Sequence, residues 1–161
     1  MNKQINSIIR QLHEVHHGLI WAGPSYKKKL VKVDENKLFV RPLSSVHSIA
    51  EIMAHIISWR KDAIIKLKTG RGELTDAHPD NWRSNDELKA IGWDKIQEED
   101  NSTLRELLEL IQDKADSFLD ELYYDPEFEG NHPYSFVLEG MLHHDIYHLG
   151  QIGLVIKLLK E

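Results

Sequence analysis

Apolar residues recur every three or four positions over most of the chain, which predicts helices rather than strands. Four long runs carry this pattern. The first spans residues 2–20, and the second begins between Ser45 and Ser48 and ends near Thr69. The third runs from Asn85 or Ile91 to residue 122, and the fourth covers residues 134–160. No segment shows a convincing strand-like alternation of apolar and polar residues.

Turn-forming residues separate these runs. Gly23 and Pro24 are expected to end the first helix, and a short helix over residues 25–33 is expected to begin at Ser25. The polar segment 70–85 is expected to be a long loop, and residues 124–133 a second loop. An interruption of the third helix is expected near Asn101 and Ser102, where a serine favours a new helix start. The pattern predicts an all-α four-helix bundle with an extra short helix and long crossover loops.

Composition narrows the class of protein. The chain has 161 residues, 41% of them apolar, which is enough for one core, so a single domain over residues 1–161 is expected. The net charge of −6 and the lack of a basic face argue against nucleic acid as a partner. No apolar run approaches the roughly 18 residues of a membrane span, and the N-terminus does not resemble a signal peptide. We therefore expect no membrane partner and a cytoplasmic location.

Histidine must supply any metal chemistry, because the chain contains no cysteine. His144 and His148 are four residues apart, so on a helix both imidazoles point the same way. His55 lies at the margin of the second apolar stripe beside Trp59, where a cleft between helices would place it. His143 projects to the far side of the fourth helix. The sequence therefore predicts an open metal site of three histidines from two helices.

Other interpretations of the histidines stay open. A single inward histidine such as His16 is more often a hydrogen-bonded core residue, and a spaced pair is also common on solvated helix faces. The segment HDIYH has the outline of the zincin motif, but Asp145 is shorter than the usual glutamate and no later histidine completes the site. A di-iron bundle needs Glu-x-x-His pairs, and Glu51 and His55 have the wrong spacing.

Several neighbours are expected to support the predicted site. Glu51 precedes His55 by one helical turn and is expected to accept the other N–H of that ring. Asp145 is expected to orient a histidine or to act as a base, although a packing hydrogen bond is an equal alternative. Trp59, Tyr147 and Gln151 flank the ligands and are expected to line the pocket.

The segments AGPSYKKKL, SVHSIAEIMAHIISWR and GMLHHDIYHLGQIGLV together resemble the DinB/YfiT-like family of four-helix-bundle proteins, over about residues 21–159. The resemblance implies a divalent metal with three histidine ligands, which fall on His55, His144 and His148. Family members include transferases that use a low-molecular-weight thiol such as bacillithiol or mycothiol, possible metal-dependent hydrolases, and proteins without an assigned reaction. Leu149 stands where the family often has arginine, so a role that depends on this arginine is not implied.

The predicted donor set indicates the chemistry of such a site. Three neutral imidazoles leave a divalent cation with its full charge, so a bound water would have a pKa near about 7 and a bound thiol would ionise. We expect a small-molecule substrate and, as the leading hypothesis, a thiol-dependent S-transferase. A metal-dependent hydrolase and a non-catalytic, metal-binding stress-response module are the alternatives. Zinc, nickel, manganese and iron all fit the ligands, and a homodimer is expected from the size of the bundle.

Overall fold

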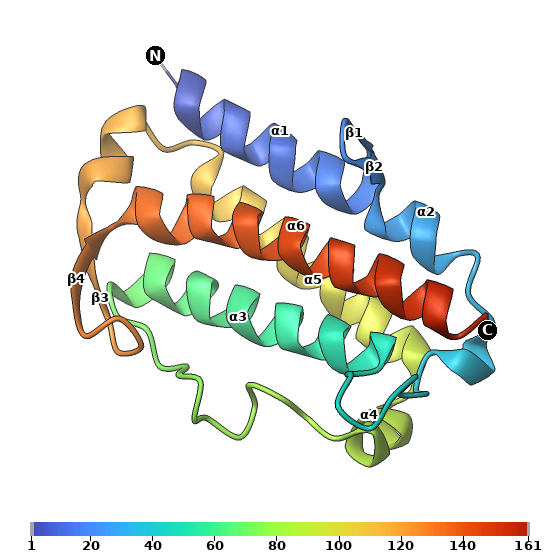
Figure 1. Cartoon of the computed structure of the whole chain (residues 1–161). Helices are drawn as coiled ribbons and strands as arrows, with labels where there is room; N and C mark the ends of the chain where they lie inside the picture. The colour runs from blue at the N-terminus through green and yellow to red at the C-terminus, as the bar shows by residue number, and fades with distance from the viewer. Residues whose placement is uncertain (1, 161) are drawn as a thin grey trace.

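Four long helices form a bundle in the computed structural model, which describes residues 2–160 (Figure 1). The all-α four-helix bundle predicted from the sequence is confirmed. The long helices are α1 (Lys3–His17), α3 (Ile49–Thr69), α5 (Trp93–Ile111) and α6 (Tyr134–Leu158). The short elements are β1 (Leu19–Ile20), β2 (Gly23–Pro24), α2 (Tyr26–Leu30), the 3₁₀ turns η1 (Glu35–Lys37) and η2 (Asp116–Asp120), α4 (Asn85–Ile91), β3 (Leu122–Asp125) and β4 (Gly130–Pro133).

The order of the helices requires a connection along the length of the bundle. Helices α1 and α6 run in one direction, and α3 and α5 run in the other (Figure 1). Helix α3 packs against both α5 and α6, and α1 packs against the same two helices. Because α3 and α5 are parallel neighbours, the chain must return from the end of α3 to the start of α5. Residues 70–84 make this return beside α3, and we call this segment the crossover.

The predicted apolar stripes form one shared core. Ile5, Leu12, Ile49, Ile56 and Ile152 are fully buried within it. Helix α3 begins with a capping box, in which the Ser48 hydroxyl accepts the Glu51 N–H and the Glu51 carboxylate accepts the Ser48 N–H. Helix α3 ends at Gly70, whose φ of 74° is the left-handed conformation that glycine adopts readily.

Several predicted boundaries were wrong. Helix α1 ends at His17 rather than residue 20, because residues 19–24 form the β1–β2 hairpin. The predicted third helix breaks at Gly92, which has a φ of 91°, and not at Asn101 or Ser102. Helix α5 ends at Ile111, well before residue 122.

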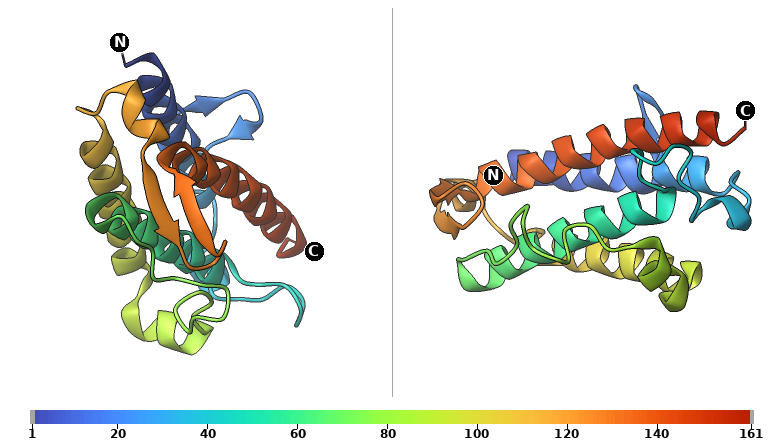
Figure 2. Two further views of the ribbon diagram at one scale, coloured as in Figure 1. Left: turned by 90° about the vertical axis from the view of Figure 1, so that its left-hand side faces the viewer. Right: turned by 60° about the horizontal axis from the view of Figure 1, so that its bottom comes forward.

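The expectation of no strands also failed. Strands β3 and β4 pair antiparallel, and Figure 2 shows this hairpin across one end of the bundle. Each strand has only four residues, too few for an alternating pattern to stand out in the sequence. In residues 2–160, no helix combines the length and hydropathy that crossing a bilayer requires.

Candidate metal centre

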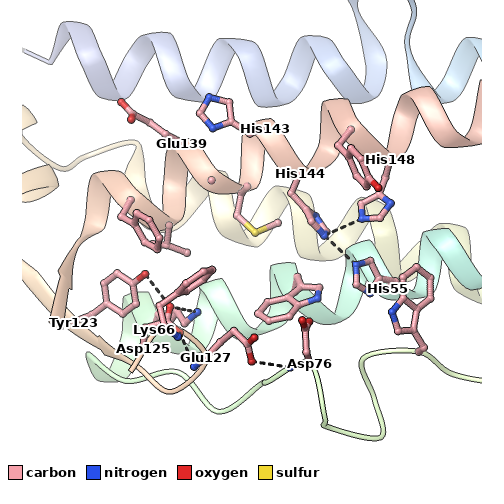
Figure 3. A pocket seen from close by; sticks show the side chains of 18 of the residues that line it. His55, Lys66, Asp76, Tyr123, Asp125, Glu127, Glu139, His143, His144 and His148 are labelled. Carbon is pink, nitrogen blue, oxygen red and sulfur yellow. Dashed lines mark hydrogen bonds and ion pairs between the residues drawn. The ribbon is translucent and has the colours of Figure 1, made fainter. Parts of the chain in front are cut away.

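Three histidine side chains converge between α3 and α6 (Figure 3). The Nε2 atom of His144 lies 3.0 Å from Nε2 of His55 and 3.0 Å from Nε2 of His148. One ligand atom of each residue lies within 4.8 Å of the other two. His55 and His148 are buried, and His144 is half-buried. The structure therefore brings together the three histidines that spacing and helix facing selected, and we call them the histidine trio.

Two carbonyl oxygens fix the orientation of the rings. Nδ1 of His55 lies 2.9 Å from the backbone oxygen of Asn81, and Nδ1 of His148 lies 2.7 Å from Oε1 of Gln151. Because a carbonyl oxygen can only accept, both rings donate from Nδ1 and keep a lone pair on Nε2. The two lone pairs point at Nε2 of His144, which can donate at most one proton.

At least one Nε2 lone pair of the trio therefore has no hydrogen-bond donor among the described protein atoms. Nδ1 of His144 is also buried, with no hydrogen-bond partner among residues 2–160. Nitrogen atoms that bind one ion at about 2.0–2.1 Å are separated from one another by distances close to those between the trio's nitrogens. The donor set and its outer hydrogen bonds fit a divalent cation with open coordination positions.

The pKa values of the trio keep the imidazoles in the form that binds metal. Burial lowers the pKa of His55 to about 4 and that of His144 to about 3. Burial also lowers the pKa of His148. At neutral pH all three rings are neutral, so a metal ion does not have to displace a proton from them.

The crossover supplies residues that sequence reasoning missed. The Trp82 ring stacks on His55 with ring centroids 3.9 Å apart, and on His47 with centroids 3.8 Å apart. Oδ1 of Asn81 accepts the indole N–H of Trp59 at 2.9 Å, and Nδ2 donates to the Asp76 backbone oxygen at 2.9 Å. These contacts hold the crossover against the trio. Asn81 and Trp82 lie in a polar, aperiodic segment, so no periodic signal could place them at the site.

An open cleft of about 740 Å³ extends from the trio to the β3–β4 hairpin. The trio lies at one end, and Lys66, Tyr123 and Asp125 lie at the other (Figure 3). We call this space the cleft. Its walls include Trp59, Tyr147 and Gln151, the residues expected to line a pocket. His143, expected on the far side of its helix, also borders the cleft but is not part of the trio.

The expected contact between Glu51 and His55 is absent from the described structure. The Glu51 carboxylate instead accepts hydrogen bonds from Arg41 Nε at 2.9 Å and Arg41 Nη2 at 2.6 Å, besides the Ser48 N–H. Glu51 lies in the first turn of α3, and helical side chains lean toward the N-terminus. Its carboxylate is therefore directed to the cap and away from the following turn.

Asp145 contacts a histidine outside the trio. It is fully buried and is not among the residues that line the cleft, so the geometry does not support the expected role as a catalytic base, which stays a prediction. Oδ2 of Asp145 accepts from Nε2 of His16 at 2.7 Å, so Asp145 does orient a histidine, but one outside the trio. Asp145 follows His144 directly, so its side chain projects about 100° further around the axis of α6. This rotation turns Asp145 toward the bundle axis.

A buried polar cluster surrounds Asp145. It takes one side chain from each long helix, namely His16 (α1), Arg60 (α3), Asp100 (α5) and Asp145 (α6). Arg60 Nη1 donates to Asp100 Oδ1 at 2.8 Å. Burial and Arg60 act to lower the pKa of His16, but the carboxylates of Asp145 and Asp100 outweigh them and the pKa is raised. His16 is thus a hydrogen-bonded core residue, the alternative that sequence reasoning favoured.

Fold and site together define an α-helical bundle with a candidate three-histidine metal centre at the end of an open cleft. Residues 26–152 match the DinB superfamily, and the chain belongs to this family.

A solved structure supports the same fold. YfiT from Bacillus subtilis, described as a probable metal-dependent hydrolase with an unusual four-helix bundle topology, superposes with a TM-score of 0.66. The alignment covers 99% of this chain and 90% of YfiT, at 12% sequence identity. At this identity the likeness shows a common fold. No curated protein matches the chain significantly.

Proposed function

We propose that this protein is a metal-dependent hydrolase that cleaves a small-molecule ester or amide in the cleft. The observation that carries the proposal is the convergence of three Nε2 atoms, with the separations given above, on a cleft that all three imidazoles line. The description of YfiT as a probable metal-dependent hydrolase supports it. A closed structural site would instead be surrounded by protein on every side.

A divalent cation held by the trio would act as a Lewis acid, which would lower the pKa of a water molecule toward about 7 and polarise a carbonyl group. The protein holds the ligands in place for this chemistry. Asn81 and Gln151 keep His55 and His148 protonated on Nδ1, so both rings present Nε2. Trp82 covers one face of His55, and apolar residues such as Val137 and Met141 line the cleft.

The thiol-dependent S-transferase stays a prediction. A thiol cofactor that carries carboxylates would need a cationic partner in the cleft. The ammonium of Lys66 is already paired with Asp62 and Asp125. For this reason the geometry favours hydrolysis over thiol transfer. The non-catalytic binding module is separated from both by the experiments below.

The first test concerns the metal. Protein purified without an affinity tag should contain about one divalent ion per chain by elemental analysis. The His148→Ala variant should lose the ion, because two histidines bind far more weakly than three. His143→Ala is the matched control, since His143 is on the same helix and borders the same cleft but lies outside the trio. Equal metal content in both variants would contradict a site built on His148.

The second test concerns the reaction. Protein loaded in turn with zinc, nickel, manganese or iron is assayed with neutral aryl esters and amides, against His148→Ala as background. Turnover above this background supports the hydrolase. Turnover only when a low-molecular-weight thiol and an electrophile are supplied overturns it in favour of the S-transferase. Metal binding without turnover of any substrate overturns it in favour of the binding module.

A further inference from the structure

We infer that the cleft selects molecules with an apolar, ring-bearing or alkyl body whose end near the hairpin is neutral or positively charged, and that it disfavours anions there. This inference deepens the proposed function. It rests on that function for the orientation of the substrate, because the bond that is cleaved must lie near the trio. Three features of the cleft support it: the walls, the charges along them, and a glycine that keeps the cleft open.

The walls of the cleft are mainly apolar and aromatic. Its volume of about 740 Å³ lies within the range of small-molecule sites, about 300–1,000 Å³. Planar rings border it along its whole length. The aromatic residues are Trp59, Trp82, Tyr123, Phe128, Phe136 and Tyr147.

Two phenylalanines near the hairpin remain exposed in the structure. Phe128, between β3 and β4, is 56% exposed, and Phe136 in the first turn of α6 is 41% exposed. Their rings meet edge to face with centroids 5.0 Å apart. A ligand body that extends from the trio to this pair would remove both rings from water, and this burial would contribute to its affinity.

The charges along the cleft oppose an anion. Among the described residues that line it, Lys66 is the one lysine or arginine. Its ammonium lies 2.8 Å from Asp62 Oδ2 and 2.7 Å from Asp125 Oδ2, so two carboxylates already surround one cation. An anion at this end of the cleft would have to displace a buried carboxylate from Lys66.

Three further carboxylates border the cleft, those of Asp76, Glu127 and Glu139. The Asp76 N–H donates to Glu127 Oε2 at 2.8 Å, which joins the crossover to the hairpin. Figure 3 shows Glu127 on the hairpin side of this contact, whereas Asp76 lies between Glu127 and the trio, with its Oδ1 3.4 Å from Asn81 Nδ2. An ammonium group is attracted to this region and a carboxylate is repelled.

Gly140 keeps the wall of α6 open. A Cβ atom built at Gly140 would meet nothing within 4 Å, and Gly140 lines the cleft. Gly150 is equally open and lies on the same helix, but it does not line the cleft. The same substitution at the two positions therefore separates filling the cleft from any general effect on α6. Neither glycine has the positive φ that would forbid a side chain.

The test uses binding, so it does not depend on turnover. The probes are 4-phenylbutylammonium, 4-phenylbutanol and 4-phenylbutyrate, which share a phenylalkyl body and differ in the charge of the terminal group. Binding to the full chain is measured by ligand-observed NMR and calorimetry after chelation of metal, and for the ammonium and the alcohol also with zinc bound. The ammonium and the alcohol should bind, and the carboxylate should bind about tenfold more weakly than the ammonium.

Variants locate the binding. Gly140→Leu should weaken the alcohol and the ammonium by about tenfold, by filling space that the body occupies, whereas Gly150→Leu should leave both unchanged. The exposed Phe128→Ala change should weaken both probes as well, and it provides a second reading if Gly140→Leu does not fold. Glu127→Gln should weaken the ammonium and not the alcohol.

Equal binding of the carboxylate and the ammonium would overturn the charge preference. Absence of binding by all three probes, or equal effects of Gly140→Leu and Gly150→Leu, would overturn the cleft as the binding site. A protein that binds these probes but hydrolyses no ester would retain this inference and contradict the proposed function alone.

Discussion

In His55 and His148, a hydrogen bond from Nδ1 to a carbonyl oxygen decides which ring nitrogen carries the proton. The i, i+4 spacing and the apolar stripes placed the trio correctly, because both depend only on helical geometry. The same reasoning failed for Glu51, which the capping box of α3 directs to Ser48. Helical facing also does not say which of two buried faces of α6 meets a cleft, and Asp145 lies on a face that does not line it.

Substitutions of Gln151 test whether the hydrogen bond to His148 supports metal binding. Gln151→Ala removes the oxygen that accepts the Nδ1–H of His148, so metal affinity should fall about tenfold or more. Gln151→Glu keeps an acceptor at the same position and should retain most of the affinity. Competition with a chromophoric chelator measures both values. An alanine variant as tight as the wild type would show that this hydrogen bond does not support the ligand.

Short elements between the helices complete the site, and these were the hardest to predict. The crossover was correctly expected to be a long loop, but its contacts with His55 depend on the path of the chain between two parallel helices. The β3–β4 hairpin has strands too short to show alternation. Lys66 ties this hairpin to α3 through Asp125.

Asp125 connects the hairpin to the acid stability of the protein. Burial acts to raise the pKa of Asp125, but the hydrogen bond and charge of Lys66 outweigh burial and lower it. The unfolded chain therefore takes up this proton at higher pH, near about 4, than the folded protein does. The stability that Asp125 contributes is present above that pH and is lost as the pH falls through the lowered pKa.

We therefore expect the free energy of unfolding to fall as the pH drops below about 4. Asp125→Asn should be less stable at neutral pH by about 3 kcal/mol, because it leaves Lys66 buried with one partner fewer, and its stability should vary less in acid. Urea titrations at a series of pH values measure both effects. Asp120→Asn, at an exposed aspartate, is the control. An unchanged acid dependence in Asp125→Asn would contradict the assignment.

Across the whole molecule, the buried polar cluster links the four long helices. His16, Arg60, Asp100 and Asp145 come from α1, α3, α5 and α6 in turn, so each helix contributes one ionisable side chain to the same interior point. The sequence placed His16 in the first apolar stripe but gave no means of pairing residues separated by as many as 129 positions. Only the packing order of the helices makes those pairs.

Asp145→Asn tests this cluster. Loss of the carboxylate leaves the buried Arg60 and His16 with Asp100 as their remaining anion, so the free energy of unfolding should fall by about 3–5 kcal/mol. Glu139→Gln, an exposed change on the same helix, should shift it by no more than about 0.5 kcal/mol. Denaturant unfolding of both variants measures the difference. Equal stability would mean that the cluster adds no net stability.

The crossover has a consequence for protein engineering. It contributes Asn81 and Trp82 to the trio's surroundings and Asp76 to the cleft, yet it belongs to none of the four long helices. Chain connections tolerate changes in length at small entropic cost. Libraries that vary the exposed side chains of residues 76–80, while keeping the buried Leu74 as well as Asn81 and Trp82, can therefore retune which molecules enter and leave the scaffold and its imidazoles in place.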